Sequence, residues 1–339
     1  MNLFFMLVAF AVLSCAAPGK PVIVGDPEGS TGKPRELDAG VPKTAKEPPA
    51  EKESPTEEEP PAEPSKVVVE FDPEERDYPW METKPGDPLW KRFSPPAGYR
   101  RIPSEKGSFA NWLRLLPLKP GKPPVHLYNG DLKYSQDVHV AVVDIDVGKR
   151  DLQQCADAVM RLRAEYLLAA GSAGKICFRL GRGDRATWSK WRDGFRPPKG
   201  NKRTPWERKA RPNGSYRNFR KYMNKVFGLS GTGALKGTLS QVNDVSKIEI
   251  GDVFIERQPG TNFGHAVLVM DMAENQNGRR AFLLSQSYMP AQEIHILKNN
   301  EASGLSPWYT LEPGEILKTP EWSFPPDSLR RFPKKGCGG

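Results

Sequence analysis

Cys155 and His265 are the residues of this 339-residue sequence whose side chains together can carry out nucleophilic catalysis. In such a pair the imidazole takes the thiol proton and the thiolate attacks a carbonyl carbon, so the two groups must come within hydrogen-bond reach. A third polar group must hold the tautomer of the imidazole, and Gln286 is the residue that we expect in this role. These residues predict a cysteine hydrolase.

Cys155 falls near the start of a predicted helix. Asp151 is a good N-cap residue, and Gln154 three residues later completes a capping box, so we expect a helix over residues 152–168. Its apolar residues recur at the spacing of one helical face, at Cys155, Val159, Leu162 and Tyr166.

A thiol in the first turn of a helix has two chemical advantages. The positive end of the helix dipole lowers its pKa, and the unpaired backbone N–H groups can stabilise an oxyanion. We therefore expect the backbone N–H of Cys155 and the side chain of Gln154 to form the oxyanion or substrate-binding site. The alternative is that Cys155 is a small apolar residue of the buried face, as free cysteines often are.

His265 begins one of three predicted strands, residues 251–255, 264–271 and 281–288, which we expect to pair antiparallel. The turn between the last two strands decides which residue lies opposite His265. A loop over residues 274–278 would place Ser287 there, whereas a two-residue turn at Asn277-Gly278 would place Pro290 there. The strand pattern alone thus leaves the third catalytic residue open.

Four short motifs occur in an order that resembles papain-like cysteine amidases of the CHAP and NlpC groups. Those proteins have a Cys at the head of a helix, then GD before an apolar strand, GH before a second strand, and a polar orienting residue on the third. Here the places are filled by Gln154-Cys155, Gly251-Asp252, Gly264-His265 and Gln286-Ser287. The resemblance implies a papain-like fold, an amide bond as the substrate and the catalytic roles assigned above.

Over residues 89–332 the chain resembles a bacterial envelope family, domain of unknown function 4846. The residues that carry this resemblance are 109–118 (FANWLRLLPL), 153–167 (QQCADAVMRLRAEYL), 264–267 (GHAV) and 286–293 (QSYMPAQE). It implies an exported protein, often a lipoprotein, and implies no activity.

The N-terminal part of the chain predicts export. Residues 3–17 are apolar and uncharged, which is typical of a signal peptide, and Val12-Leu13-Ser14-Cys15 resembles a lipobox with Cys15 as the lipid attachment site. Ordinary cleavage after Ala17 is the alternative. We expect a membrane-anchored lipoprotein that faces the periplasm or the cell exterior, or a secreted protein if it is not lipidated.

Residues 18–66 are rich in Pro and Glu and nearly free of large apolar side chains, so they predict a disordered linker. Residues 67–335 are expected to form a single domain. The whole chain has 50 Lys and Arg against 41 Asp and Glu, and because the linker has more acidic than basic residues, the domain is strongly basic.

A basic insertion is expected at about residues 179–225, where Lys and Arg alternate with Trp, Tyr and Phe. Such a mixture is typical of binding to anionic polymers or stacked bases; the alternative is that the aromatic side chains dock the insertion onto the domain. For an exported chain we expect a cell-envelope polymer as partner, peptidoglycan or another anionic polymer, together with the membrane through a lipid anchor. Nucleic acid is not an expected partner.

The expected fold class is α+β, with an antiparallel sheet packed against the Cys-bearing helix in a papain-like arrangement. Ser108 is expected to begin a helix over residues 109–116, and residues 125–128 and 138–145 are expected to be strands, the second one central in the sheet.

The other polar residues and the cysteine pattern predict structural roles. Asp157 and Arg161 have the i,i+4 spacing of an ion pair, and Cys177 is expected in the core. Cysteine and histidine spacings typical of a zinc site do not occur, so we expect no metal and no cofactor. The alternative to an enzyme is a non-catalytic lipoprotein that binds an envelope polymer or a partner on the same scaffold.

Overall fold

The computed structural model of the protein describes residues 78–181, 183–198, 205–258, 260–261, 263–302, 304–334 and 336. All of them belong to a compact unit that spans residues 62–339. The expected signal peptide (1–17) and linker (18–66) lie outside the described residues. Within the described ranges, no helix has both the length and the apolar character needed to cross a membrane.

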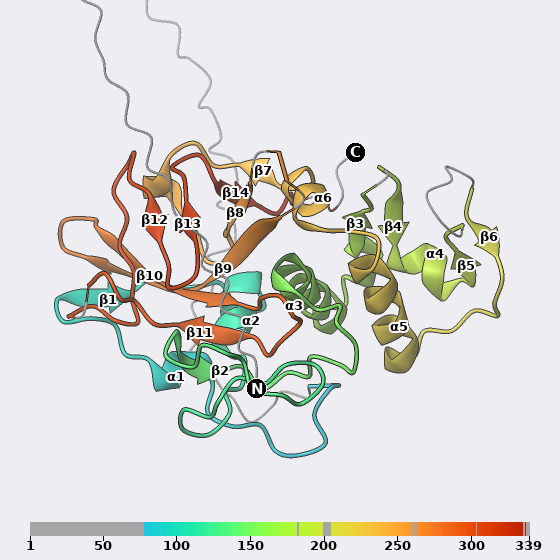
Figure 1. Ribbon diagram of the computed structural model, residues 1–339, viewed down its shortest axis with the longest axis horizontal. Coiled ribbons are helices and arrows are strands. Elements are labelled where there is room, and N and C mark those ends of the chain that lie inside the picture. The colour runs from blue at the N-terminus through green and yellow to red at the C-terminus, as the bar shows by residue number, and fades with distance from the viewer. Residues whose placement is uncertain are drawn as a thin grey trace, which may run out of the picture. The chain divides into compact units, whose positions relative to one another are not determined.

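One antiparallel sheet forms the centre of the α+β fold (Figure 1). Strands that follow one another in sequence pair as neighbours in its middle part, from β8 to β10. The strand order is β2 (His139–Val142), β11 (His295–Leu297), β10 (Arg280–Gln286), β9 (Gly264–Asn275), β8 (Val253–Arg257), β14 (Leu329–Arg331) and β7 (Ser240–Gln241), and β1 (Tyr99–Arg101) pairs with the end of β9.

The two longest helices of the described chain are α3 (Cys155–Ala169) and α5 (Tyr216–Phe227). Shorter helices are α1 (Leu89–Arg92), α2 (Phe109–Arg114), α4 (Trp188–Arg192), α6 (Thr232–Lys236), and the 3-10 helices η2 (Ala173–Lys175) and η3 (Val245–Lys247). Small two-stranded sheets pair β3 (Cys177–Arg179) with β4 (Arg185–Thr187), β5 (Phe195–Arg196) with β6 (Glu207–Arg208), and β12 (Leu317–Lys318) with β13 (Ser323–Phe324).

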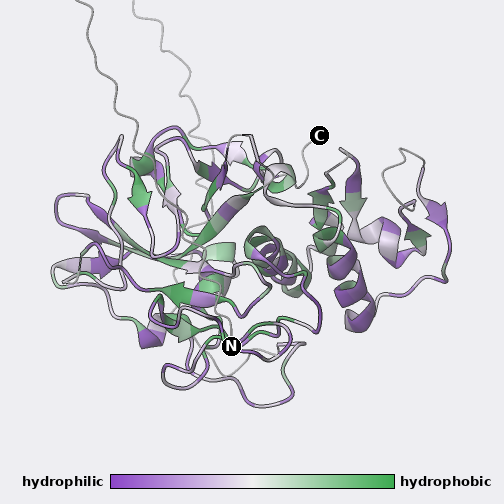
Figure 2. Ribbon diagram, viewed as in Figure 1, coloured by the Kyte–Doolittle hydropathy of each residue, from purple (hydrophilic) through white to green (hydrophobic). Residues whose placement is uncertain are grey.

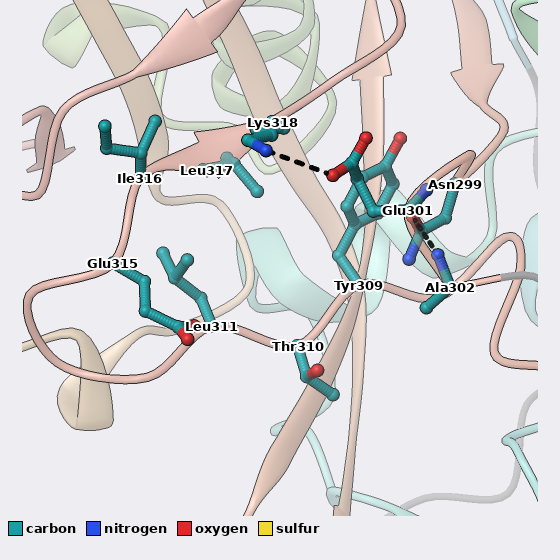
Figure 3. Close-up of a pocket in the computed structure, with 10 residues that line it drawn as sticks. All are labelled: Asn299, Glu301, Ala302, Tyr309, Thr310, Leu311, Glu315, Ile316, Leu317 and Lys318. Atoms are coloured by element: carbon teal, nitrogen blue, oxygen red, sulfur yellow. Dashed lines mark hydrogen bonds and ion pairs between the residues drawn. The ribbon is translucent and has the colours of Figure 1, made fainter.

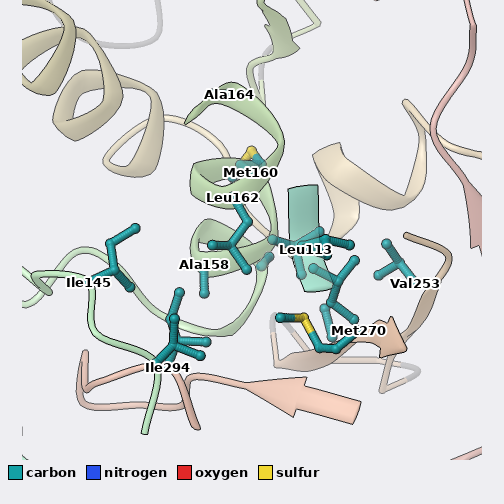
Figure 4. Close-up of a cluster of buried hydrophobic side chains, with 14 of the residues drawn as sticks. Leu113, Ile145, Ala158, Met160, Leu162, Ala164, Val253, Met270 and Ile294 are labelled. Carbon is teal, nitrogen blue, oxygen red and sulfur yellow. The ribbon is translucent and has the colours of Figure 1, made fainter. Parts of the chain in front are cut away.

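Both faces of the sheet are buried along its middle strands, β8, β9 and β10. Helices α2 and α3 cover one face, where Leu113, Leu162 and Met270 belong to one hydrophobic cluster (Figure 4). Because side chains alternate along a strand, Val267 and Val269 of β9 pack into a second cluster on the other face. Each fully buried side chain of this kind stabilises the fold by roughly 1.5–3 kcal/mol. Burial on both faces explains the nearly continuous apolar run of β9, which is coloured green in Figure 2.

Helix α3 begins at Cys155, three residues later than predicted. Its N-cap is Gln154, whose backbone N–H donates to Oδ2 of Asp157 at 3.2 Å. The predicted cap at Asp151 is wrong, because Oδ1 of this residue accepts a hydrogen bond from the backbone N–H of Ala291 at 2.7 Å. A tertiary contact therefore takes the carboxylate that the local pattern assigned to the helix.

The guanidinium of Arg161 is fully buried in the middle of α3. The predicted ion pair with Asp157 is wrong, because the Asp157 side chain turns back to the helix N-terminus. Burial lowers the pKa of Arg161, but the neighbouring carboxylates outweigh it and hold the pKa above its ordinary value. The acceptors come from α3, the segment before it and α5: Glu165 at 2.5 Å, Gln153 at 2.9 Å, Asp146 at 3.0 Å and the Tyr216 hydroxyl at 3.0 Å.

The predictions for the first two strands need correction. Residues 125–128 form only isolated bridges, between His126 and Leu132 and between Leu127 and Gln292. Strand β2 lies at the end of the sheet order and not in its centre. Its sequence is apolar because another segment covers its outer edge, where Leu118 bridges to Val143.

The expected basic insertion folds onto the rest of the domain through its aromatic side chains. Trp188, Trp191, Phe219 and Tyr222 are all buried, and they join the same hydrophobic cluster as α3. The interpretation of these four as a surface for stacked bases is therefore wrong. Cys177, expected in the core, is half-buried in β3 and is disulfide-bonded.

Candidate functional site

Cys155 is the first residue of α3, and its side chain is buried against the beginning of β9. Sγ lies 3.6 Å from the backbone oxygen of Gly264, to which it donates a hydrogen bond. Burial raises the pKa of the Cys155 thiol to about 11, and the charge of Asp157 adds to this effect. The resting side chain is therefore a neutral thiol at physiological pH.

Three polar groups around the sulfur act in the opposite direction. The backbone N–H groups of Ala156 and Ala266 and the hydroxyl of Thr232 interact with Cys155 and lower its pKa, although burial outweighs them. Ala156 contributes because it lies in the first turn of α3, where N–H groups have no partner within the helix. A thiolate formed here would find hydrogen-bond donors already in place.

His265 is the second residue of β9, and its side chain is buried among aromatic rings. Its ring centroid lies 4.8 Å from that of Tyr288, 5.5 Å from that of Trp322 and 5.9 Å from that of Phe324. Burial lowers the pKa of His265 to about 4, and a hydrogen bond to Gln286 offsets only part of this effect. The imidazole is therefore neutral at pH 7.

Gln286, the last residue of β10, fixes the tautomer of His265. Its Nε2 donates to Oε2 of Glu321 at 2.6 Å, and since a carboxylate can only accept, the amide nitrogen must face Glu321. The amide oxygen then faces His265 and lies 2.8 Å from its Nε2. That nitrogen must carry the proton, which leaves Nδ1 of His265 as the basic nitrogen.

The same row of polar groups continues across the sheet. The Gln286 amide nitrogen lies 3.2 Å from Nε2 of His295, whose Nδ1 donates to the backbone oxygen of Glu293 at 2.9 Å. Burial lowers the pKa of His295 to about 3, so this ring is also neutral. Lys133 ends the row with an ion pair of 2.5 Å to Glu321.

The structure brings His265 and Gln286 into contact and places Cys155 beside the backbone of residues 264–266. Within the described chain, no hydrogen bond joins the sulfur of Cys155 to the imidazole. The two side chains approach β9 differently, because α3 packs on the face of Ala266 whereas the His265 ring packs against Phe324 on the other face. The amide nitrogen of Gln154, the expected oxyanion donor, bonds to Oδ1 of Asp151 at 2.9 Å.

The glycines of the two short motifs have packing roles. A Cβ on Gly264 would lie 2.6 Å from the backbone oxygen of Glu256 and 2.8 Å from Cγ2 of Thr232. Gly251 has φ +93°, and a Cβ there would lie 2.7 Å from the ring of Phe109. The first glycine therefore lets strand β8 and helix α6 approach the sulfur, and the second lets α2 approach the sheet.

The aspartate of the GD motif has a structural partner. Asp252 forms a two-pronged ion pair with Arg331 of β14, at 2.7 and 2.8 Å, which joins β8 to the last strand. Burial raises the pKa of Asp252, and the Arg331 guanidinium offsets part of this rise. Nothing in its contacts links Asp252 to the sulfur of Cys155.

The sequence does not predict four further residues of the candidate site, which are Glu321, Lys133, Tyr288 and Thr232. Each reaches the site through a tertiary contact; Lys133 and Glu321, for example, are 188 residues apart. No local pattern marks Glu321, Lys133 or Thr232. Only Tyr288 lies inside a motif that was singled out, residues 286–293.

A pocket of about 460 Å³ lies away from these residues (Figure 3). It is lined by residues between Asn299 and Lys318, and a 3.4 Å ion pair joins Glu301 to Lys318 across it. The described residues contain no group of three or more His, Cys, Asp or Glu side chains placed to hold a metal ion.

The architecture and the site define an α+β protein with a central antiparallel sheet, a buried free thiol at a helix N-terminus and a buried histidine on the adjacent strand. The chain belongs to the family described as domain of unknown function 4846, whose model matches residues 89–331. No curated protein and no solved structure matches the chain.

Proposed function

We propose that this protein is an envelope-associated cysteine amidase on a papain-like scaffold, with Cys155 as nucleophile, His265 as general base and Gln286 as the orienting residue. The observation that carries the proposal is the 2.8 Å hydrogen bond between Nε2 of His265 and Oε1 of Gln286. Because Glu321 fixes the amide, this bond directs the proton to Nε2 and keeps Nδ1 available as a base. The substrate is an amide bond, which we place in the peptide part of peptidoglycan.

In the proposed reaction Nδ1 of His265 takes the proton of the Cys155 thiol while the sulfur attacks the carbonyl carbon. The oxyanion accepts hydrogen bonds from the backbone N–H of Cys155 and from the Gln154 amide once the latter leaves Asp151. The C–N bond then breaks, and the imidazolium gives its proton to the departing amine. Water, with His265 again as base, hydrolyses the thioester and restores the thiol.

The pair is uncharged at rest, so the proton must move when substrate is bound. In the resting state Cys155 donates to Gly264 and has no hydrogen bond to His265, so the proposal requires that the sulfur leaves Gly264 and that the two side chains come within hydrogen-bond reach at the beginning of β9. The N–H groups of Ala156 and Ala266 then stabilise the thiolate that burial alone would disfavour.

The test compares amine release from a peptidoglycan digest by the wild type and by Cys155→Ser and His265→Ala. We expect both variants to stay folded and to lose turnover by at least roughly a thousandfold, since groups that act as a unit cannot be removed singly without losing the reaction. His126→Ala is the matched control, because His126 is partly exposed and has no contact with Gln286 or Cys155. Folded variants with undiminished turnover would end the proposal.

A non-catalytic lipoprotein that binds an envelope polymer or a partner is the second candidate. It is favoured by the neutral state of the thiol, whose pKa is raised to about 11, and by the hydrogen bond that holds the sulfur on Gly264. A wild type that binds peptidoglycan but releases no amine from any envelope fraction would favour this candidate.

The proposed location is outside the cytoplasm, either anchored to the membrane by a lipid on Cys15 and facing the periplasm or the cell exterior, or secreted if the chain is cleaved without lipidation. The resemblance to an exported family supports this location. The disulfide at Cys177 also supports it, because disulfides persist mainly in oxidising compartments.

A further inference from the structure

A groove of about 410 Å³ lies beside the segment that leads into α3. One wall is this segment and the other is helix α5, and the groove has cationic side chains on both walls. The lining residues are Arg150, Leu152, Trp191, Lys221, Asn224, Lys225 and Gly228.

The amphipathic pattern of α5 directs its lysines into this groove. Lys221, Asn224 and Lys225 are spaced three and four residues apart and therefore share one face of the helix. The opposite face, which includes Tyr222 and Val226, is buried in the hydrophobic cluster next to α3. The buried face fixes the helix, so the position of the cationic face is fixed as well.

The three cations of the groove have no acidic partner in the described part of the chain. Arg150, Lys221 and Lys225 are exposed and take part in none of its ion pairs. The nearest carboxylate in the sequence, Asp151, accepts hydrogen bonds from the Ala291 N–H and the Gln154 amide. The residues that line the groove thus include three cations and no carboxylate.

The groove lies within a few residues of the candidate nucleophile. Leu152 lies three residues before Cys155, and Arg150 lies five residues before it. The chain between Arg150 and Cys155 can therefore span at most roughly 18 Å. Hydrogen bonds from the Leu152 N–H to the Arg150 oxygen and from the Gln154 N–H to the Leu152 oxygen, both 2.8 Å, hold this segment in turns. Since an extended peptide advances about 3.4 Å per residue, a peptide of about five residues can cover the distance between the backbones of Arg150 and Cys155.

Resting on the proposed amidase function, we infer that this groove binds the carboxylate groups of an acidic peptide substrate. A guanidinium and two ammonium groups bind carboxylates through charge-assisted hydrogen bonds. The Asn224 amide can both donate to and accept from a peptide group. The apolar atoms of Leu152 and Trp191 contact the methylene groups of an acidic side chain, which a bare phosphate chain lacks.

The test measures binding of fluorescein-labelled hexaglutamate to the full chain by fluorescence polarisation at low salt. The Cys155→Ser protein is used beside the wild type, so that binding is read without turnover. We expect Lys221→Gln/Lys225→Gln to bind roughly 5- to 30-fold more weakly, the loss of two exposed charge contacts. The matched control is Lys106→Gln/Lys122→Gln, two exposed lysines that do not line the groove.

Each outcome separates the groove from the chemistry. Three outcomes would overturn the inference: unchanged binding by the groove variant, equal binding of labelled hexaglutamine, or no binding to any protein. The assignment of carboxylate as the ligand would be overturned if polyphosphate displaced the probe at a lower concentration than hexaglutamate does. Groove-dependent binding with no hydrolysis of acidic peptides would leave the groove in place and contradict the amidase. Hydrolysis that the groove substitutions leave unchanged would contradict the groove alone.

Discussion

Acidification should destabilise this protein through its buried histidines, and the variant His265→Gln isolates the contribution of one of them. Burial lowers the pKa of His265 from 6.5 to about 4. Between these values the unfolded chain binds a proton that the folded chain excludes, so stability falls as the pH falls. The contribution is fully present above pH 6.5, and its loss is complete below about pH 4.

The size of this loss of stability follows from the pH interval over which the folded and unfolded states differ in bound protons. From pH 6.5 to pH 4.5 the difference is two pH units, and each unit corresponds to about 1.4 kcal/mol, so His265 should account for about 3 kcal/mol. Asp157 acts in the opposite direction, because burial raises its pKa and its contribution is lost as the pH rises. Asp157 and His295 are present in both proteins, so their effects cancel in the comparison except for the charge interaction between His265 and His295, which is the smallest contribution to the lowered pKa of His295.

The assay is urea unfolding of the wild type and His265→Gln at about pH 7 and about pH 4.5. Glutamine remains uncharged and places an amide N–H near the position of imidazole Nε2, from which it can donate to Gln286. On acidification the free energy of unfolding of the wild type should fall by about 3 kcal/mol more than that of the variant. If both proteins lose the same free energy within about 1 kcal/mol, the ring is not held neutral by burial and the assignment of its tautomer loses its basis.

Three further predictions concern the sulfur, the strand beside it and the N-terminus. With a pKa of about 11, Cys155 should react with iodoacetamide about 90-fold faster at pH 10 than at pH 8, measured on its tryptic peptide by mass spectrometry, whereas an activated thiolate would show almost no change. Gly264→Ala should lower the free energy of unfolding by roughly 2–4 kcal/mol, because its Cβ would clash with Glu256 and Thr232; an unchanged melting temperature would show that this contact is not tight. If Cys15 is lipidated, Cys15→Ala should move the protein from the detergent phase to the soluble fraction and abolish labelling by a palmitate analogue, and an unlabelled, soluble wild type would indicate ordinary cleavage after Ala17.

The parts of the fold that sequence predicted depend on local signals. Ser108 was expected to begin a helix, and its hydroxyl accepts from the backbone N–H of Asn111 at 3.1 Å at the start of α2. The antiparallel pairing of β8, β9 and β10 follows from short connections between apolar strands. These elements depend on hydrogen bonds and short loops between residues that are close in sequence. They can therefore be predicted from the sequence.

The register at the site could not be read in this way. Glu274 pairs with Arg280, so the turn spans residues 275–279, and a bulge between Leu283 and Leu284 shifts the pairing by one residue before Ser285 meets Leu268. Continued toward His265, this register differs by one residue from the alternative that placed Ser287 opposite the ring. A bulge depends on how both faces of a strand pack, and single-strand patterns contain no signal for it.

The candidate site likewise contains some residues that the sequence predicts and others that it does not. Residue type and motif order predict Cys155, His265 and Gln286 as the residues of the site, and the hydrogen bond between the last two is present. Glu321, which decides the orientation of the Gln286 amide, lies in a segment without any motif. Its role exists only in three dimensions, so sequence reasoning had no means of finding it.

The buried Arg161 has an evolutionary consequence. The guanidinium of Arg161 donates hydrogen bonds to side chains from α3, the segment before it and α5. Substitution of one of these residues leaves a buried charge or donor without its partner, which lowers the free energy of unfolding by roughly 3–5 kcal/mol. Such positions can change only as a set, through epistasis. Among homologous sequences, substitutions at positions 146, 153, 165 and 216 should therefore appear together with a change at 161, while the exposed lysines of α5 vary independently.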